Sequence, residues 1–141
     1  MESLWPELFN EQDIKTPTEI LEIQAKFLPK LTKDMVYAEI VQPNEVHSAF
    51  INYDFLFRLN LKGKFLENYR FTVLTFAHNI SFYPVKIQLD KDISVECGMT
   101  ENRFDLKNEY EFISFLKDVF NSQKMRIVIT AIMKLSNLPN F

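Results

Sequence analysis

Apolar and polar residues alternate along the segment 48–61, SAFINYDFLFRLNL. The odd-numbered positions from 49 to 61 carry apolar or aromatic side chains, whereas the even-numbered positions include Asn52, Asp54 and Arg58. A period of two is typical of a β-strand with one buried face and is not produced by a helix. The pattern therefore predicts a strand over 48–61 whose odd-numbered side chains face the core.

Further strands are predicted from β-branched and aromatic content and from the turn residues that bound each run. They are the segments 35–42, 69–77, 80–89 and 93–97, with Pro84 expected at an edge or a bulge. A loop over 62–68 passes through Gly63 and joins the first two long strands. Short connections of this kind favour an antiparallel sheet, because parallel neighbours need a dozen or more linking residues.

Two segments begin with helix-capping signals, 16–28 at Thr16-Pro17 and 108–120 at Asn108. Apolar residues follow at helical spacing, namely Ile20, Ile23, Phe27 and Leu31 after the first cap and Phe112, Ile113, Leu116, Val119 and Phe120 after the second. The segment 124–135 fits either a strand or a helix. Its length favours a helix, because most strands are shorter than about 10 residues.

Together these elements predict a single α+β domain over 1–141, with an antiparallel sheet of four or five strands. Two or three helices are expected mainly on one face, the odd-residue face, and the chain length suits one hydrophobic core. Residues 1–15 show no sustained period, but they contain Leu4, Trp5, Leu8 and Phe9. We expect them to form an ordered N-terminal arm that packs onto the domain, because burying large apolar side chains is favourable.

The even-residue face of the sheet mixes apolar and charged side chains and is predicted as the functional surface. If the strands pair around the loop 62–68, Asp54 lies beside Phe76 and diagonal to His78. The candidate partner-binding residues are Phe50, Asp54, Leu56, Arg58, Leu74, Phe76 and His78. A patch of this composition suits another protein or a second copy of the chain in a homodimer. Coverage of this face by residues 1–15 is an open alternative.

Composition and charge mainly argue against particular classes of function. A formal net charge of −3 disfavours binding to nucleic acid, and only 2 glycines disfavour a phosphate-binding loop. No metal or cofactor is predicted, since the chain lacks CxxC and HExxH spacing. The single Cys97 excludes an intrachain disulfide and favours a cytoplasmic location. No apolar run approaches the ~20 residues that a membrane span requires.

Catalysis has one candidate pair, Asp54 and His78, in which the carboxylate could orient a general base. No nucleophile elbow or oxyanion loop accompanies the pair. Cys97 is expected to be a buried apolar side chain, because the adjacent Glu96 opposes thiolate formation. The sequence therefore favours a small cytoplasmic protein-binding module without catalysis, such as an inhibitor, immunity-type or adaptor protein. Two alternatives stay open: a binder of a small apolar ligand in a pocket between sheet and helices, and an enzyme that uses the Asp54–His78 pair.

Overall fold

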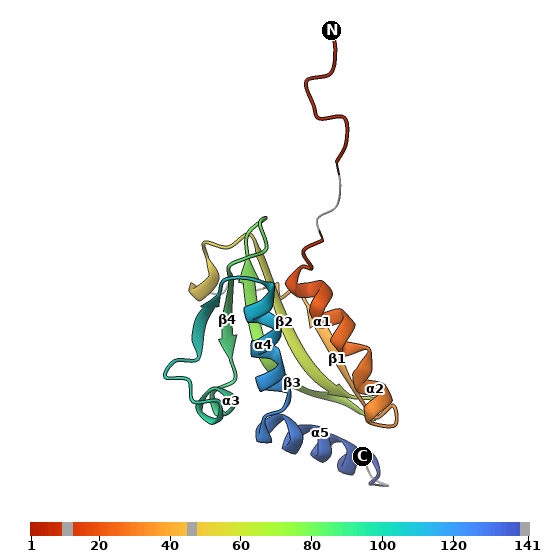
Figure 1. Ribbon diagram of the computed structural model, residues 1–141. Coiled ribbons are helices and arrows are strands. Elements are labelled where there is room, and N and C mark those ends of the chain that lie inside the picture. The colour runs from red at the N-terminus through yellow and green to blue at the C-terminus, as the bar shows by residue number, and fades with distance from the viewer. Residues whose placement is uncertain (10–12, 45–47, 139–141) are drawn as a thin grey trace.

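The computed structural model describes residues 1–9, 13–44 and 48–138. Its elements, in chain order, are α1 (Pro17–Ala25), α2 (Phe27–Leu31), β1 (Val36–Val41), the 3-10 turn η1 (Ser48–Phe50), β2 (Phe55–Gly63), β3 (Leu66–His78), β4 (Val85–Leu89), α3 (Lys91–Glu96), β5 (Arg103–Leu106), α4 (Glu109–Phe120) and α5 (Gln123–Ser136). The strands form one antiparallel sheet in the order β1-β2-β3-β4-β5. Figure 1 shows α1 and α4 against one face of the sheet and α5 across its lower end. The predicted α+β class is confirmed.

Capping side chains start the longer helices where the sequence predicted. Thr16 Oγ1 accepts the Glu19 N–H at 3.1 Å, and Asn108 Oδ1 accepts the Glu111 N–H at 2.9 Å. Each contact satisfies a backbone donor that has no partner within the helix. The ambiguous C-terminal segment is the helix α5, as its length favoured.

The hydrophobic core lies between the sheet and the helices that cover it. Its most deeply buried side chains include Leu21, Leu61, Leu74, Phe76, Ile87, Phe112 and Ile132. The Phe76 ring stacks on Phe57, with ring centroids 5.2 Å apart, and lies 6.4 Å from the ring of Phe112. These rings join β3 to β2 on one side and to α4 on the other. In α4, Phe115 is buried, whereas Ile113, which was predicted to face the core, is half exposed.

The hairpin between β2 and β3 is tighter than the sequence predicted. A two-residue turn joins the strands, so both of them continue through the predicted loop 62–68. The pairing changes with the turn, and Phe57 lies opposite Phe76 in place of Asp54. The pairing of residues 74–78 is displaced by an odd number of residues from the predicted pairing. The side chains of this part of β3 therefore point to the opposite face from the one predicted. Its even-numbered side chains therefore share the helix-covered face with the odd-numbered side chains of β2.

The predicted strand 48–61 is a strand only from Phe55 onwards. Before that residue the chain forms η1 and a bend, and the Phe50 side chain is buried. The Phe50 ring meets the ring of Tyr53 with centroids 6.5 Å apart, and Lys86 Nζ lies 6.0 Å from the Tyr53 ring centroid. Two predictions for this segment are therefore wrong: Phe50, predicted on the partner-binding face, is buried, and Ile51, predicted to face the core, is 68% exposed.

The predicted strand 93–97 is wrong, because the chain there forms the helix α3. Asp90 Oδ2 accepts the Ile93 N–H at 3.1 Å and caps the helix. Ile93 is buried and Val95 is exposed, so the β-branched residues that favoured a strand have the one-sided burial of a short helix. The fifth strand is instead β5, which pairs with β4, and the predicted strand 80–89 is confined to β4.

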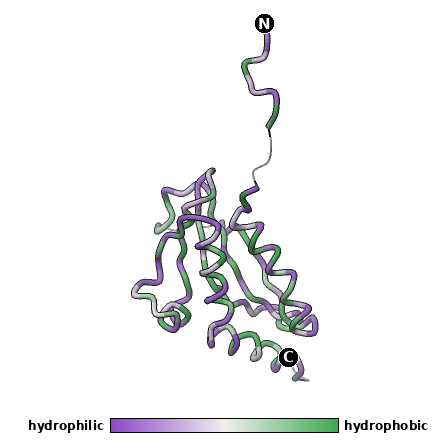
Figure 2. The backbone as a smooth tube through the Cα atoms, viewed as in Figure 1, coloured by the Kyte–Doolittle hydropathy of each residue, from purple (hydrophilic) through white to green (hydrophobic). Residues whose placement is uncertain are grey.

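The N-terminal arm, defined here as residues 1–9, does not pack onto the domain as predicted. Leu4, Trp5, Leu8 and Phe9 are 89%, 76%, 71% and 72% exposed. Figure 1 shows the arm leading away from the sheet and helices, and Figure 2 shows hydrophobic stretches along it. Residues 10–12 of the predicted arm lie outside the described residues.

Candidate functional site

The residues predicted as a partner-binding patch do not form one surface. Leu74, Phe76 and His78 lie on the helix-covered face of β3 and are buried. Leu56 and Arg58 are next in sequence to Phe57, which lies on the covered face of β2. Because successive side chains of a strand point to opposite faces, they project from the other face of the sheet. Side chains that the sequence grouped together are therefore separated by the thickness of the sheet.

The contacts of Asp54 and His78 do not build a catalytic pair. The His78 ring lies in the core beside Phe55 and Phe57, with centroid distances of 5.4 and 5.9 Å. Its Nδ1 is 2.7 Å from the carbonyl oxygen of Asn79, and because a carbonyl only accepts, Nδ1 carries the proton. Asp54 is exposed before β2, and its N–H donates to Asn79 Oδ1 at 3.0 Å. His78 is thus fixed in the core and not beside an open substrate site.

The sheet face opposite α1 and α4 carries a hydrogen-bonded row of polar side chains. Asn60 is fully buried; its Nδ2 donates to Glu39 Oε1 at 3.3 Å and its Oδ1 accepts from Thr72 Oγ1 at 2.8 Å. Lys62 Nζ lies 4.0 Å from Glu39 Oε2. Buried polar groups that satisfy one another stabilise the strands that carry them. We therefore assign this row to the pairing of β1, β2 and β3.

An apolar groove, called here the helix groove, is lined by residues of α1, α2, α4 and α5 and of the strands β1 and β2 beneath them. Its volume is about 600 Å³. Ala38, Leu59 and Leu61 from the sheet contribute to its lining, and the two leucines are buried. The helices supply the walls with Ile20, Ile23, Phe27, Leu28, Leu31, Ile113, Leu116, Phe120, Met125 and Ile129.

Several apolar side chains on the walls of the helix groove remain accessible to water. Ile23, Phe27, Leu31 and Ile113 are 42%, 49%, 78% and 47% exposed. The sequence identified all of them as members of apolar helix faces. Helical spacing shows which residues share a face, but it does not show whether a facing helix comes close enough to cover them. Exposed apolar side chains that line one groove make it a candidate interaction site.

Lys15 and Lys117 are the charged residues that line the helix groove in the described chain. The Lys15 N–H donates to Glu109 Oε2 at 3.3 Å, and the Lys15 carbonyl oxygen accepts from the Tyr83 hydroxyl at 3.0 Å. These contacts fasten the backbone where the chain enters α1. The end of the groove at Lys15 is therefore fixed in position.

Titration of Tyr83 tests this fastening. Burial, followed by the nearby carboxylates of Glu109 and Glu19, raises the pKa of Tyr83 to about 12. The folded pKa lies above the unfolded value, so the stabilisation is fully present below about pH 10 and is lost as the pH rises through about 12. The near-ultraviolet absorbance difference between wild type and Tyr83→Phe is expected to titrate with a midpoint of about 12. In urea-unfolded protein the same difference should titrate near ~10, and a midpoint near ~10 in the folded protein would contradict the contact.

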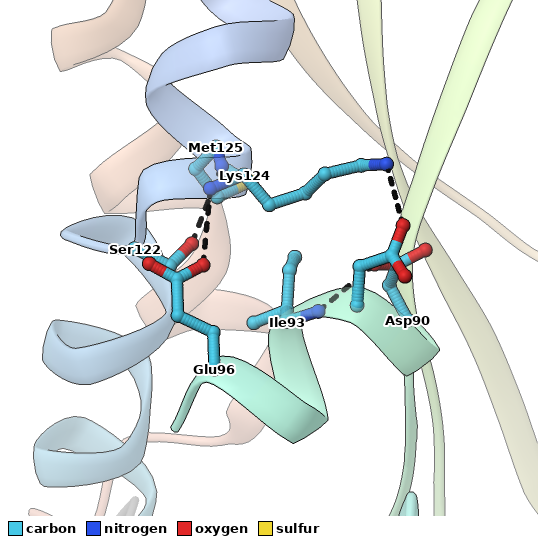
Figure 3. Close-up of polar contacts among 7 residues, drawn as sticks. Asp90, Ile93, Glu96, Ser122, Lys124 and Met125 are labelled. Atoms are coloured by element: carbon cyan, nitrogen blue, oxygen red, sulfur yellow. Dashed lines mark hydrogen bonds and ion pairs between the residues drawn. The ribbon is translucent and has the colours of Figure 1, made fainter. Parts of the chain in front are cut away.

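A second polar cluster joins α3 to the start of α5, as Figure 3 shows. The Glu96 carboxylate accepts the backbone N–H groups of Gln123 and, at 3.1 Å, Lys124. Lys124 Nζ donates to Asp92 Oδ2 at 2.8 Å, and this hydrogen bond lowers the pKa of Asp92 and raises the pKa of Lys124. A carboxylate at a helix N-terminus complements the helix dipole. The cluster is therefore explained by the docking of α3 against α5.

Cys97 is not an activated nucleophile. Burial raises the pKa of its thiol, and Glu96 and Asp118 raise it further. A higher pKa leaves less thiolate at neutral pH, and the thiolate is the reactive form. Within the described ranges, His, Cys, Asp and Glu side chains form no group of three or more that could hold a metal ion.

Across the described segments, no helix combines the length and hydrophobicity needed to cross a membrane. Comparison of the chain with protein-family models, with curated proteins and with solved structures finds no match. The helix groove has the strongest physical case for function, because its apolar surface is continuous, open and flanked by lysines.

Proposed function

We propose that the chain is a binding module without catalysis that takes up an apolar segment of a partner protein in the helix groove. The observation that carries the proposal is the apolar surface that runs from the buried Leu59 and Leu61 to the exposed Phe27, Leu31 and Ile113. Covering such surface contributes about 25 cal/mol for each Å² removed from water. An occupant that reaches the exposed walls therefore gains affinity from them.

The shape and charge of the helix groove support a helical, acidic occupant. Amphipathic helices bind grooves of this kind through apolar side chains spaced three or four residues apart. Lys15 and Lys117 favour a segment with carboxylates beside its apolar face, because complementary charges fix orientation and speed association. The class of function is the one predicted from sequence, but the proposed surface is the helix groove in place of the sheet face. The single Cys97 supports a reducing, cytoplasmic setting.

A small apolar ligand is the second candidate occupant. The volume of about 600 Å³ falls within the range of roughly 300–1,000 Å³ that is usual for ligand pockets. The exposed walls favour a protein segment, because an open groove would leave much of a small ligand in water. The enzymatic alternative receives no support from the contacts of His78, which end in the core and at Asn79.

Selection of displayed random peptides tests the proposal. Ile113→Glu places a carboxylate on the groove wall, and Ile127→Glu on α5 is the matched control. Ile127 is 53% exposed against 47% for Ile113, and it is not among the residues that line the groove. Wild type and control are expected to enrich peptides with acidic residues and with apolar residues three or four positions apart. Ile113→Glu is expected to bind these peptides at least ~10-fold more weakly.

Peptides that bind all three proteins equally would contradict the proposal. The fluorescent probe anilinonaphthalene sulfonate separates the second candidate from the first. If no peptide is enriched, but the probe binds wild type and Ile127→Glu and not Ile113→Glu, the helix groove accepts small apolar molecules only.

A further inference from the structure

We infer that the occupant of the helix groove is the N-terminal arm, residues 1–9, of a second copy of this chain. The inference rests on the proposed function and names the partner of the same groove. Exchange of arms between two copies covers the exposed apolar side chains of both the arm and the groove walls. The product is a dimer held by two equivalent arm–groove contacts.

The N-terminal arm carries an apolar surface suited to the groove. Leu4, Trp5, Leu8 and Phe9 are all exposed, and the rings of Trp5 and Phe9 already lie together with centroids 6.5 Å apart. In a helix, Leu4 and Leu8 would lie on one face because they are four residues apart, and so would Trp5 and Phe9; the two pairs would be adjacent within an arc of about 140°. The arm thus offers four large apolar side chains that can enter a groove together.

Local contacts of the arm agree with a helix that begins at Leu4. Ser3 Oγ accepts the Trp5 N–H at 3.2 Å, which is the contact that a capping serine makes to the second residue of a helix. Pro6 would occupy the third helical position, in the first turn, where its missing N–H is not needed. Residues 4–9 would span about 9 Å as a helix, and the nine residues of α1 span about 13 Å, so the arm fits along this wall.

The charges of the arm and the groove are complementary. Residues 1–9 contain Glu2 and Glu7 and no lysine or arginine, whereas Lys15 and Lys117 line the groove. Glu7 falls outside the helical face formed by the four apolar residues, where it can meet a lysine at the groove edge. Opposite charges at the edge of an apolar contact favour one orientation of the occupant over others.

The position of the arm favours a second copy over its own groove. Lys15, which ends the connection to the arm, is fastened by hydrogen bonds to Glu109 and Tyr83. Figure 1 shows residues 1–9 apart from the sheet and helices of their own copy. Lys15 also lines the groove. An arm of a second copy that binds in the groove therefore lies close to the residue that precedes α1 of the first copy. Because both copies carry the same arm and the same groove, exchange in both directions closes as a two-fold dimer.

Light scattering of the full chain over a range of concentrations tests the inference, with fluorescence of Trp5, the single tryptophan, as a second readout. The wild type is expected to be a dimer that dissociates on dilution, as its Trp5 emission moves to longer wavelength. Leu8→Glu/Phe9→Glu in the arm and Ile113→Glu in the groove should each weaken dimerisation at least ~10-fold. Ile127→Glu should dimerise as the wild type does.

Mixing the arm variant with the groove variant provides the discriminating measurement. One variant keeps an intact groove and the other keeps an intact arm, so the mixture is expected to form heterodimers with a single arm–groove contact. The inference would be overturned if the mixture did not associate at protein concentrations far above the dissociation constant of the wild-type dimer. It would also be overturned by a wild type that stays monomeric, including a monomer whose Trp5 is shielded by its own groove.

The outcome for the proposed function is separate. If the chain is monomeric and the selected peptides still depend on Ile113, the groove binds another protein and the arm is not its occupant. If the peptides do not depend on Ile113 but the dimer is lost in the arm variant alone, the arm acts away from the groove. Either result overturns the exchange.

Discussion

Replacing Phe76 by alanine is expected to lower the free energy of unfolding by about 3–5 kcal/mol, a large share of the roughly 5–15 kcal/mol that stabilises a typical domain. The Phe76 side chain is fully buried, stacks on Phe57 at 5.2 Å and lies 6.4 Å from the ring of Phe112. Truncation removes the contact between two strands and α4 and leaves a cavity that the surrounding rings cannot fill. Apolar transfer and lost packing therefore add in the same direction.

Urea unfolding followed by circular dichroism measures this loss. Fluorescence is unsuitable as the probe, because the single tryptophan, Trp5, lies on the N-terminal arm and outside the hydrophobic core. Phe65→Ala is the control, since Phe65 is half exposed in the turn between β2 and β3 and its truncation is expected to cost less than about 1 kcal/mol. Equal losses in the two variants would show that Phe76 lies on an exposed face, as the sequence predicted.

Gly63→Ala is expected to cost about 1–3 kcal/mol, although it adds only a methyl group. A Cβ at this position would lie 2.7 Å from Ile132 Cγ2 in α5 and 3.3 Å from Leu66 Cβ. The first distance is well below van der Waals contact, so either α5 or the end of β2 must move. Ile132 is buried and branched at Cβ, which leaves its Cγ2 methyl little freedom to rotate away. Urea unfolding again measures the loss.

The Ile132→Leu substitution tests the proposed cause, because it removes the branching methyl while it keeps the side-chain volume. The Gly63→Ala/Ile132→Leu variant is expected to lose less stability than the two single losses together, with a coupling of about 0.5–3 kcal/mol. Strictly additive losses would show that α5 does not approach β2 at Gly63. Since α5 supplies Met125 and Ile129 to the helix groove, Gly63→Ala should also weaken groove binding.

The helices that could be predicted from sequence are those with a complete local signal. Thr16 and Asn108 precede regular apolar faces, and both cap their helices as expected. The segment 93–97 was wrongly predicted as a strand because β-branched residues in a short run fit both a strand and a helix. Helix capping acts over three or four residues, so the sequence contains the whole interaction.

The pairing of β2 with β3 could not be predicted, because it depends on a turn whose length the sequence leaves open. Displacement of the register by an odd number of residues moved Leu74 and Phe76 from the predicted surface into the core. The helix groove had a weaker signal still. Ile23 and Ile113 were identified as apolar helix residues, but the gap between their helices arises only when elements distant in sequence pack on the sheet.

Because each strand pairs with its neighbour in sequence, the sheet can assemble from contacts that are local along the chain, which lowers the entropic cost of pairing. The walls of the helix groove have no such local connection, since α1 comes before all five strands in the sequence and α4 comes after them. Local opening of native proteins separates the less tightly tied elements while the most stable unit stays intact. The groove can therefore widen at α2, which has no buried residue, while Lys15 holds the start of α1 to Glu109 and Tyr83. An occupant then enters on the timescale of local opening and not of unfolding.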